Sequence, residues 1–186
     1  MSSPVIEKYG WNIYYHPVFD QQFEQQLEFV ESLNRKLSEG TITQESYTCH
    51  SEVKLLGTLI DLIEEKIPSD PLAKRFLLQD DLKLFSRVKH LGLPSRYRLF
   101  FKAFPATKRI VILWLGHPRR AGDKKRDCYE VFKKMVGKGQ FPLAFEELVQ
   151  KNDLILHRRQ PRQAVLIAYV EPQRVDWEYW EEVKLY

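Results

Sequence analysis

The stretch Ile110–Leu115 limits the possible folds of this chain more than any other. It reads Ile-Val-Ile-Leu-Trp-Leu, without the alternation of polar and apolar residues that marks a strand with one solvated face. Strands with this pattern are usually buried on both faces. We therefore expect this strand inside a sheet, and Gly116 ends it.

The preceding stretch, Leu84–Phe104, has the pattern of a β-hairpin with a basic exposed face. Because strand residues alternate between faces, Arg87 and Lys89 share a face of the first arm, and Arg96 and Arg98 share a face of the second. A Gly-Leu-Pro-Ser segment supplies the turn. If both rows lie on one side of the sheet, four cations converge, and such crowding favours an anionic partner such as phosphate. The alternative is a solvated edge hairpin whose charges only keep it soluble.

A strand and two helices are predicted ahead of the hairpin. Trp11–Tyr15 is rich in β-forming residues. Apolar residues then recur at helical spacing from Val18 to about Gly40, and again over Ser51–Lys66, with the polar segment 40–50 as a loop between them. The two helices are expected to pair antiparallel on the sheet. The predicted fold is α+β, with a small, mostly antiparallel sheet packed against an N-terminal helical pair and followed by a C-terminal helix.

The last helix is predicted to run from Asp123, as its N-cap, to Val136. Cations in its first turn would oppose the helix dipole, which hints at a function for them elsewhere. These cations are Lys124, Lys125 and Arg126. Tyr129 lies beside the apolar face, so its hydroxyl can reach the surface, although a boundary tyrosine without a further role is the more common case.

Charge is distributed unevenly along the chain. Residues 83–138 hold 16 Lys and Arg against 3 Asp and Glu, a local balance of +13, whereas the remainder carries −9 within a net charge of +4. This asymmetry favours a nucleic-acid surface or an acidic protein partner. Cys49 and Cys128 lack metal-ligand spacing, which argues against a zinc site. No apolar run suits a membrane helix and no signal peptide is recognisable, so a cytoplasmic protein without a membrane partner is expected.

The C-terminal part differs from the rest in composition. A short helical piece is predicted over 141–150 and a strand over Ala164–Val170, and the end, Val175–Tyr186, is aromatic and acidic. We expect residues 1–153 to form the main domain and 154–186 an extension. The acidic end can mask a basic cleft of its own or of a neighbouring molecule, but a terminal element packed on the body is the simpler interpretation.

Several segments carry a family resemblance. They are GWNIYYHPVF at the first strand, FSRVK and SRYRLFFKAF at the hairpin, IVILWLG in the next strand, and KKRDCYEVFKKMVGKGQFP at the last helix. In sequence, order and rough spacing, over about residues 10–150, they resemble the YhaV family of RelE/ParE-like toxins. The resemblance implies a RelE-like fold and an endoribonuclease that cleaves mRNA on or near translating ribosomes. It also implies a neutralising antitoxin of the PrlF-like, swapped-hairpin type.

This sequence departs from the family pattern in three places. The loop around Gln79–Asp81 is acidic where family members tend to be basic or neutral. The loop HPRRAGDKKR has its own wording, and the chain beyond about residue 154 has no counterpart. These departures bear on substrate preference and regulation more than on the fold.

Metal-free RNA cleavage uses the neighbouring 2′-hydroxyl as nucleophile, with a base, cations for the phosphorane and an acid for the leaving 5′ oxygen. The resemblance carries Arg87 and Lys89 onto the family's first basic pair, Arg98 onto its second-arm arginine and Tyr129 onto its helix tyrosine. On this basis Lys89 is the general base, and Arg96 and Arg98 clamp the scissile phosphate. Arg87 stabilises the transition state or protonates the leaving group indirectly. Tyr129 orients the nucleotide or stacks on a base.

Flanking RNA is expected on a second set of cations, and neither a metal nor a cofactor is implied. The set comprises Arg119, Arg120, Lys124, Lys125 and Arg126. His90 and His117 have no partner visible in the sequence and are weaker candidates for catalysis. Because ParE relatives share the fold but poison DNA gyrase, the alternative is a non-catalytic module that binds its antitoxin, nucleic acid or gyrase. The Arg, Lys and Tyr set, which those relatives generally lack, favours RNA cleavage over this alternative. A degenerate toxin that only binds its antitoxin is a third interpretation, against which the retained basic residues are weak evidence.

Overall fold

The computed structural model describes residues 6–95, 97–116, 127–141 and 143–147. Its strands form one five-stranded sheet in the order β1-β2-β5-β4-β3. β2 and β5 pair in parallel, whereas the other neighbouring strands are antiparallel, which confirms the mostly antiparallel sheet. The strands are β1 (Ile6–Lys8), β2 (Trp11–Tyr15), β3 (Ser86–Val88), β4 (Arg98–Phe104) and β5 (Arg109–Gly116).

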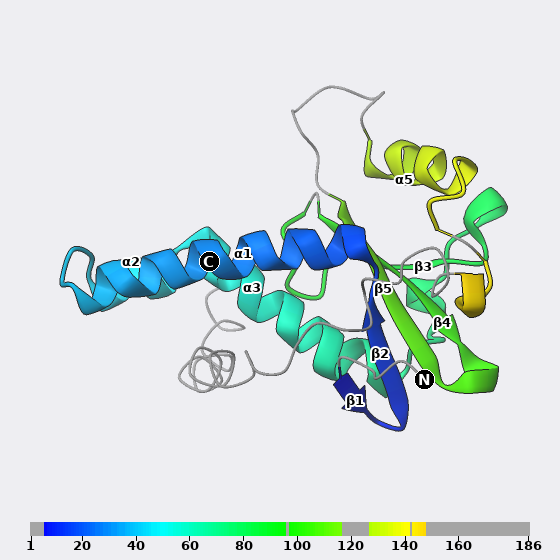
Figure 1. Cartoon of the computed structure of the whole chain (residues 1–186), viewed down its shortest axis with the longest axis horizontal. Coiled ribbons are helices and arrows are strands. Elements are labelled where there is room, and N and C mark those ends of the chain that lie inside the picture. The colour runs from blue at the N-terminus through cyan, green and yellow to red at the C-terminus, as the bar shows by residue number, and fades with distance from the viewer. Residues whose placement is uncertain (1–5, 96, 117–126, 142, 148–186) are drawn as a thin grey trace, which may run out of the picture.

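Helices cover both faces of this sheet. α1 (Pro17–Ser38) and α3 (Ser51–Asp61) share a core with one face, and α5 (Cys128–Gly137) shares a core with the other. Figure 1 shows α1 running out from the sheet to α2 (Gln44–Cys49) and α3 returning beside it, as the predicted antiparallel pair. The α+β architecture with an N-terminal helical pair and a C-terminal helix is therefore confirmed.

The predicted buried strand is β5, at the centre of the sheet. Ile110 and Ile112 pack in the core on the α1 side, and Val111 and Leu113 pack in the core on the α5 side. All four side chains are almost entirely buried. The unbroken apolar run is therefore explained by cover on both faces of the strand.

A bulge interrupts the pairing of β4 with β5. Phe100 faces Trp114 while Phe101 faces Ile112, so Leu113 is the extra residue. The bulge turns Trp114 to the same face as Phe100, and the two rings stack with centroids 5.5 Å apart. Beyond this point β5 presents the other set of alternate residues to α5.

Gly116, the last residue of β5, allows α5 to start close to the sheet. A Cβ at this position would lie 2.8 Å from the Trp114 ring and 3.0 Å from the Cβ of Cys128. Its partner across the sheet is Arg98. The close approach of α5 therefore occurs beside Arg98, the first residue of β4 and of the second arm of the basic hairpin.

α1 begins at a histidine cap. Nδ1 of His16 accepts a hydrogen bond from the Val18 amide at 3.2 Å, and Pro17 fills the first helical position, where no donor is needed. His16 is 2% exposed, and its ring meets Phe141 edge-on with centroids 4.8 Å apart. Burial lowers the pKa of His16 to about 4, against a smaller opposing effect of hydrogen bonding to the Gln140 backbone. His16 is therefore neutral at pH 7.

The prediction of an uninterrupted loop over 40–50 is wrong, because α2 occupies most of that segment. Thr43 caps α2 by accepting a hydrogen bond from the Ser46 amide at 3.1 Å. The next helix is longer than predicted. α3 continues through a π-helical segment (Leu62–Lys66) into α4 (Ile67–Ser69), and so ends one residue past Pro68.

The predicted start of α5 at Asp123 is also wrong. Asp127 is the N-cap, and its carboxylate accepts a hydrogen bond from the Tyr129 amide at 2.8 Å. Both aspartates suit a cap, so residue type alone did not separate them. The cations at 124–126 precede the helix in the chain, so the prediction that they occupy its first turn is wrong.

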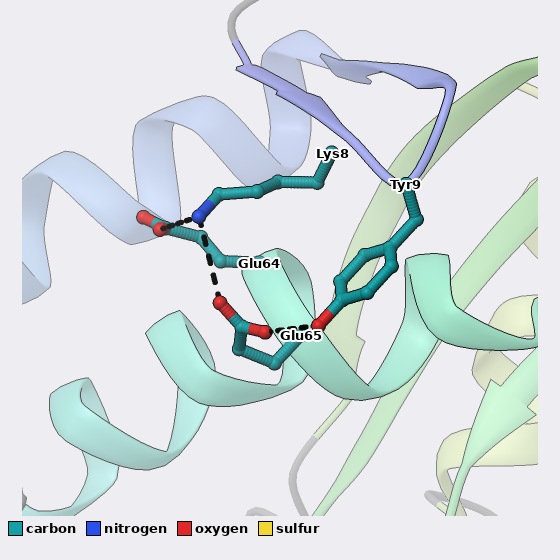
Figure 2. A network of polar contacts seen from close by, with 4 residues as sticks. All are labelled: Lys8, Tyr9, Glu64 and Glu65. Atoms are coloured by element: carbon teal, nitrogen blue, oxygen red, sulfur yellow. Dashed lines mark hydrogen bonds and ion pairs between the residues drawn. The ribbon is translucent and has the colours of Figure 1, made fainter.

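β1 is an additional strand that pairs with β2 at one edge of the sheet. Tyr9 and Gly10 between them have φ values of +52° and +73°, as two-residue hairpin turns require. The Lys8 ammonium lies 3.8 Å from Glu64 and 3.5 Å from Glu65, and the Tyr9 hydroxyl donates to Glu65 at 2.6 Å. Figure 2 shows these four side chains meeting between the hairpin and the helix. This partly exposed network ties the hairpin to the π-helical segment but adds little stability, because exposed ion pairs are weak.

The strand over Ala164–Val170, the aromatic acidic end and the whole of 154–186 lie outside the described residues. Of the helical piece predicted over 141–150, residues 145–147 are helical. Within the described ranges, no helix combines the length and apolarity needed to cross a membrane. The domain boundary at residue 153 stays a prediction.

The buried cap makes stability depend on pH. The pKa of a histidine is about 6.5 in an unfolded chain, so the unfolded state binds the extra proton first as pH falls. The contribution of His16 to the free energy of unfolding is therefore complete above about pH 6.5. It is lost progressively toward pH 4, by ~3 kcal/mol for a folded pKa of about 4.

We expect His16→Asn, which keeps a capping acceptor, to remove this pH-dependent part of the free energy of unfolding. Urea unfolding of both proteins at pH 7 and 4.5 measures it, and an unchanged difference between the two pH values would contradict the prediction.

Candidate active site

The basic face of the hairpin is the face that α5 covers in part. Arg87 on β3 pairs with Phe100 on β4, and Arg98 lies two residues before Phe100, so all three share one face. Val88 and Leu99 point the other way, into the core on the α1 side. The condition that the two basic rows lie on one side of the sheet, which the sequence left open, therefore holds for Arg87 and Arg98.

Tyr129, in the first turn of α5, joins the two arginines. Nε of Arg87 donates a hydrogen bond to the Tyr129 hydroxyl at 2.8 Å, and Nε of Arg98 donates to the same oxygen at 3.3 Å. The guanidinium carbon of Arg98 also lies 6.0 Å from the centre of the Tyr129 ring. A hydroxyl accepts two hydrogen bonds and donates one, so the proton of Tyr129 is left for a further acceptor.

One further nitrogen of each guanidinium group, Nη1, donates to backbone carbonyls. Nη1 of Arg87 donates to the carbonyl of Arg75 at 2.9 Å. Nη1 of Arg98 donates to the carbonyls of Ser95 at 2.9 Å and Tyr97 at 2.6 Å. Both arginines are thus fixed at two ends, which reduces the entropy that a bound ligand would have to remove.

The aromatic core beneath Tyr129 fixes its position. Its ring meets Phe100 edge-on with centroids 5.8 Å apart, and Phe132, one turn along α5, stacks on Phe100 at 4.0 Å. Phe132 is fully buried. The phenol is therefore placed by packing, and the hydroxyl does not depend on its polar contacts alone.

The two guanidinium groups are electrostatically uncompensated. Neither Arg87 nor Arg98 forms an ion pair with a carboxylate in the part of the chain that the structure describes. Both side chains are half-buried. Two cations that share one neutral hydroxyl repel each other, and an anion placed between them relieves that repulsion. Arginine forks suit the oxygens of a phosphate, so the arrangement is a candidate phosphate-binding site.

Lys89 stands at the rim of this site. Val88 on β3 pairs with Leu99 on β4, and the two strands are antiparallel. Lys89, the residue after Val88, therefore comes next to Arg98, the residue before Leu99. Lys89 is exposed and makes no hydrogen bond or ion pair with described residues. It is therefore free to reach a ligand bound on the arginines.

The turn after β3 is wider than the four residues predicted. His90, Leu91 and Gly92 all have positive φ, and a Cβ on Gly92 would lie 3.1 Å from Cγ2 of Thr58 on α3. This run curls the loop against the helical layer. His90 is exposed in the loop. Arg96 in this loop is not among the described residues, and neither are His117 or the expected RNA-binding cations. Those cations are Arg119, Arg120, Lys124, Lys125 and Arg126.

Two features near the site were not anticipated. Lys102 of β4 is 7% exposed, and its ammonium lies 5.0 Å from the Phe85 ring and 5.2 Å from the Phe104 ring. Burial lowers the pKa of Lys102. The sequence did hold a signal for Lys102, because the alternation of side chains along the strand puts it on the same face as Arg98. The second feature, the carbonyl of Arg75 that binds Arg87, had no signal in the sequence, because any residue type supplies a carbonyl.

Comparison with known proteins identifies the family of the chain. The family model described as a toxin with endonuclease activity, of a toxin–antitoxin system (YhaV), matches residues 13–153. The chain is similar to toxin YhaV of Escherichia coli O6:H1, 33% identical over 151 residues that cover 77% of this chain and 93% of the relative. It is similar to ribonuclease toxin YhaV of E. coli K12, 32% identical over the same shares. No solved structure matches the chain.

The family match includes β3, β4, β5 and α5, which carry Arg87, Arg98 and Tyr129. Most of the chain and nearly all of the relatives are covered. The chain therefore belongs to the YhaV family, the toxins with endonuclease activity of toxin–antitoxin systems.

Proposed function

We propose that the chain is a metal-independent endoribonuclease that cleaves mRNA by attack of the 2′-hydroxyl on the neighbouring phosphate. The observation that carries the proposal is the pair of arginines fixed on one tyrosine hydroxyl without a carboxylate partner. The similar protein of E. coli K12 is a ribonuclease toxin, which supports RNA as the substrate. The proposed catalytic set is Arg87, Lys89, Arg96, Arg98 and Tyr129.

In this mechanism the arginines stabilise the charge that develops on the phosphorane. Arg98 sits at the start of β4 with its fork held by two loop carbonyls, and Arg87 faces it from β3. Donors fixed before the substrate arrives need no reorganisation during the reaction, which is why such arrangements lower barriers. Arg96 is assigned beside Arg98 from the strand alternation alone.

Tyr129 holds the two arginines in position and can also contact the nucleotide. Because its oxygen already accepts two hydrogen bonds, its one proton can be donated to a phosphate oxygen. Lys89, exposed at the rim, is the proposed general base for the 2′-hydroxyl. Its side chain can approach a ligand without breaking a contact within the described residues.

The wider biology follows from family membership and stays a proposal. We infer that a PrlF-like antitoxin neutralises the chain and that the chain acts on mRNA at the ribosome. We also infer that its fold is RelE-like. The flanking cations at 119, 120 and 124–126 are proposed to hold RNA phosphates, with 1–153 as the toxin domain and 154–186 as the extension.

The first test is cleavage without metal. The purified protein, in EDTA, is mixed with a defined mRNA, with and without translating ribosomes. We expect products with 2′,3′-cyclic phosphate ends. Lys89→Ala should be slower by about a hundredfold or more, because general-base catalysis is worth that much, whereas Lys36→Ala on α1 should cleave normally. Folded protein that cleaves in neither condition would favour the non-catalytic module instead.

Arg98 is tested by Arg98→Ala, with Arg35→Ala on the far side of the sheet as the matched control. Loss of a fixed donor at the developing charge should slow cleavage by about a hundredfold or more. Initial rates on the same mRNA measure the effect, and circular dichroism checks the fold. A folded Arg98→Ala protein with unchanged cleavage would remove Arg98 from the site.

Tyr129→Phe separates packing from polar positioning. The ring keeps its place against Phe100, but both arginines lose their shared acceptor. We expect kcat to fall by about tenfold to a hundredfold, because small misplacements of catalytic groups have effects of that size. Tyr9→Phe, which deletes another hydroxyl contact at the opposite edge of the sheet, is the control. Equal kcat values for the two variants, both with native melting temperatures, would contradict the assignment.

A further inference from the structure

An open pocket of about 410 Å³ lies directly beside the arginine pair. Its volume is within the range of about 300 to 1,000 Å³ that small-ligand sites usually have. Arg87 and Tyr129 form one side of it, so the pocket and the candidate phosphate site share a wall. Most of the other lining residues come from the segment 77–82 between α4 and β3, which contains the acidic loop noted in the sequence.

The segment 77–82 brings both apolar surface and carboxylates to the pocket. Leu77, 46% exposed, and the partly buried Leu78 provide the apolar part. Asp81 is held by Lys133 of α5 at 2.6 Å, and that pairing lowers the pKa of the Asp81 carboxyl. Asp80 also lines the pocket, and its carboxylate has no hydrogen bond or ion pair among the described residues. The Asp81 carboxylate is thus paired within the protein, and the Asp80 carboxylate is available to a ligand.

A second phosphate is a poor occupant for this pocket. The carboxylates of Asp80, Asp81 and Glu130 line it against the two cations of Arg87 and Lys133, so negative charge prevails and a further anion is disfavoured. Apolar surface together with a free acceptor suits a flat ring that presents N–H donors. A nucleobase of the RNA meets that description, since bases are read by apolar contact and by hydrogen bonds to their edges.

We propose that this pocket receives the nucleobase next to the scissile phosphate, and that Asp80 reads its Watson–Crick edge. The inference rests on the proposed ribonuclease function and gives it a sequence preference. With the phosphate on Arg87 and Arg98, an adjacent base enters the pocket past Tyr129. Leu77 and Leu78 contact the ring, and the Asp80 carboxylate accepts from the edge.

The chemistry of a carboxylate ranks the bases. Guanine offers two adjacent donors, the ring N1–H and the exocyclic amino group, and both carboxylate oxygens can accept at once. Adenine and cytosine offer one amino donor beside a ring acceptor, which faces the carboxylate unfavourably. Uracil offers a single N–H between two carbonyls. The pocket is therefore specific for guanine, with uracil the least favoured base.

The backbone at Asp80 selects the variant for the test. Its φ is +53°, a region that asparagine tolerates as well as aspartate but that alanine does not. Asp80→Asn keeps the size and the backbone and exchanges one acceptor oxygen for an NH₂ donor. An amide presents one donor and one acceptor, and the Watson–Crick edge of each base has an adjacent donor and acceptor that it can pair with. The amide therefore loses the preference for guanine that two acceptor oxygens give.

The experiment measures cleavage of short RNAs that differ only in the bases flanking one cleavable bond, with all four bases placed in turn on each side. For the natural sequence we expect guanine on one side to be cleaved roughly tenfold to a hundredfold faster than uracil, the usual discrimination of a bidentate contact. Asp80→Asn should lower the rate for guanine and bring the rates for the four bases close together. Glu28→Gln, the same chemical change at an exposed site on α1, should leave the profile unaltered.

The outcomes separate this inference from the proposed function. Equal cleavage of all four bases on both sides overturns the pocket assignment but leaves the ribonuclease intact. A guanine preference that survives Asp80→Asn, or a uniform fall in all rates, also overturns it, and would point to a cation of a protein partner as the occupant. If no RNA is cleaved, the ribonuclease proposal fails, and binding of 2′-deoxy-substituted RNAs at the cleavage position then tests the pocket alone through the same ranking of bases.

Discussion

The stack of Phe132 on Phe100 is the contact on which the candidate site depends. It holds α5 against the sheet with ring centroids 4.0 Å apart, and Trp114 extends the stack from β5. Tyr129 lies almost one helical turn before Phe132, so the position of the phenol follows from this packing. The two arginines then converge on its hydroxyl. A buried apolar contact therefore fixes the geometry of a polar, charged site a few ångströms away.

The two faces of the sheet carry cores of different size and composition. The face toward α1 and α3 carries a large aliphatic and aromatic core and supplies most of the burial. The face toward α5 carries a smaller core, rich in aromatic rings, with the cationic residues at its border. The bulge at Leu113 and the close approach at Gly116 serve this second face, because they bring Trp114 and the start of α5 into register with β4.

Family membership and geometry contribute different parts of the functional picture. The comparisons establish a toxin with endonuclease activity. The structure adds a fixed pair of uncompensated guanidinium groups, a free lysine at the rim and an adjoining pocket of opposite character. A cationic site beside an acidic, partly apolar one matches a nucleotide, whose phosphate and base have different chemistry. That complementarity links the proposed reaction to the proposed preference for guanine.

The sequence by itself determined the elements whose signals are local or periodic. The strand Trp11–Tyr15, the place of β5 inside the sheet and the helical pair follow from β-forming residues, an unbroken apolar run and helical spacing. The family resemblance also came from the sequence. That Arg87 and Arg98 share a face was decided by the register of β3 and β4. Tertiary structure alone decided the bridge through Tyr129, the choice of Asp127 over Asp123 as the cap, the bulge in β5 and the pocket around Asp80. These features depend on how segments distant in sequence pack together, and packing across such distances leaves no periodic trace in the sequence.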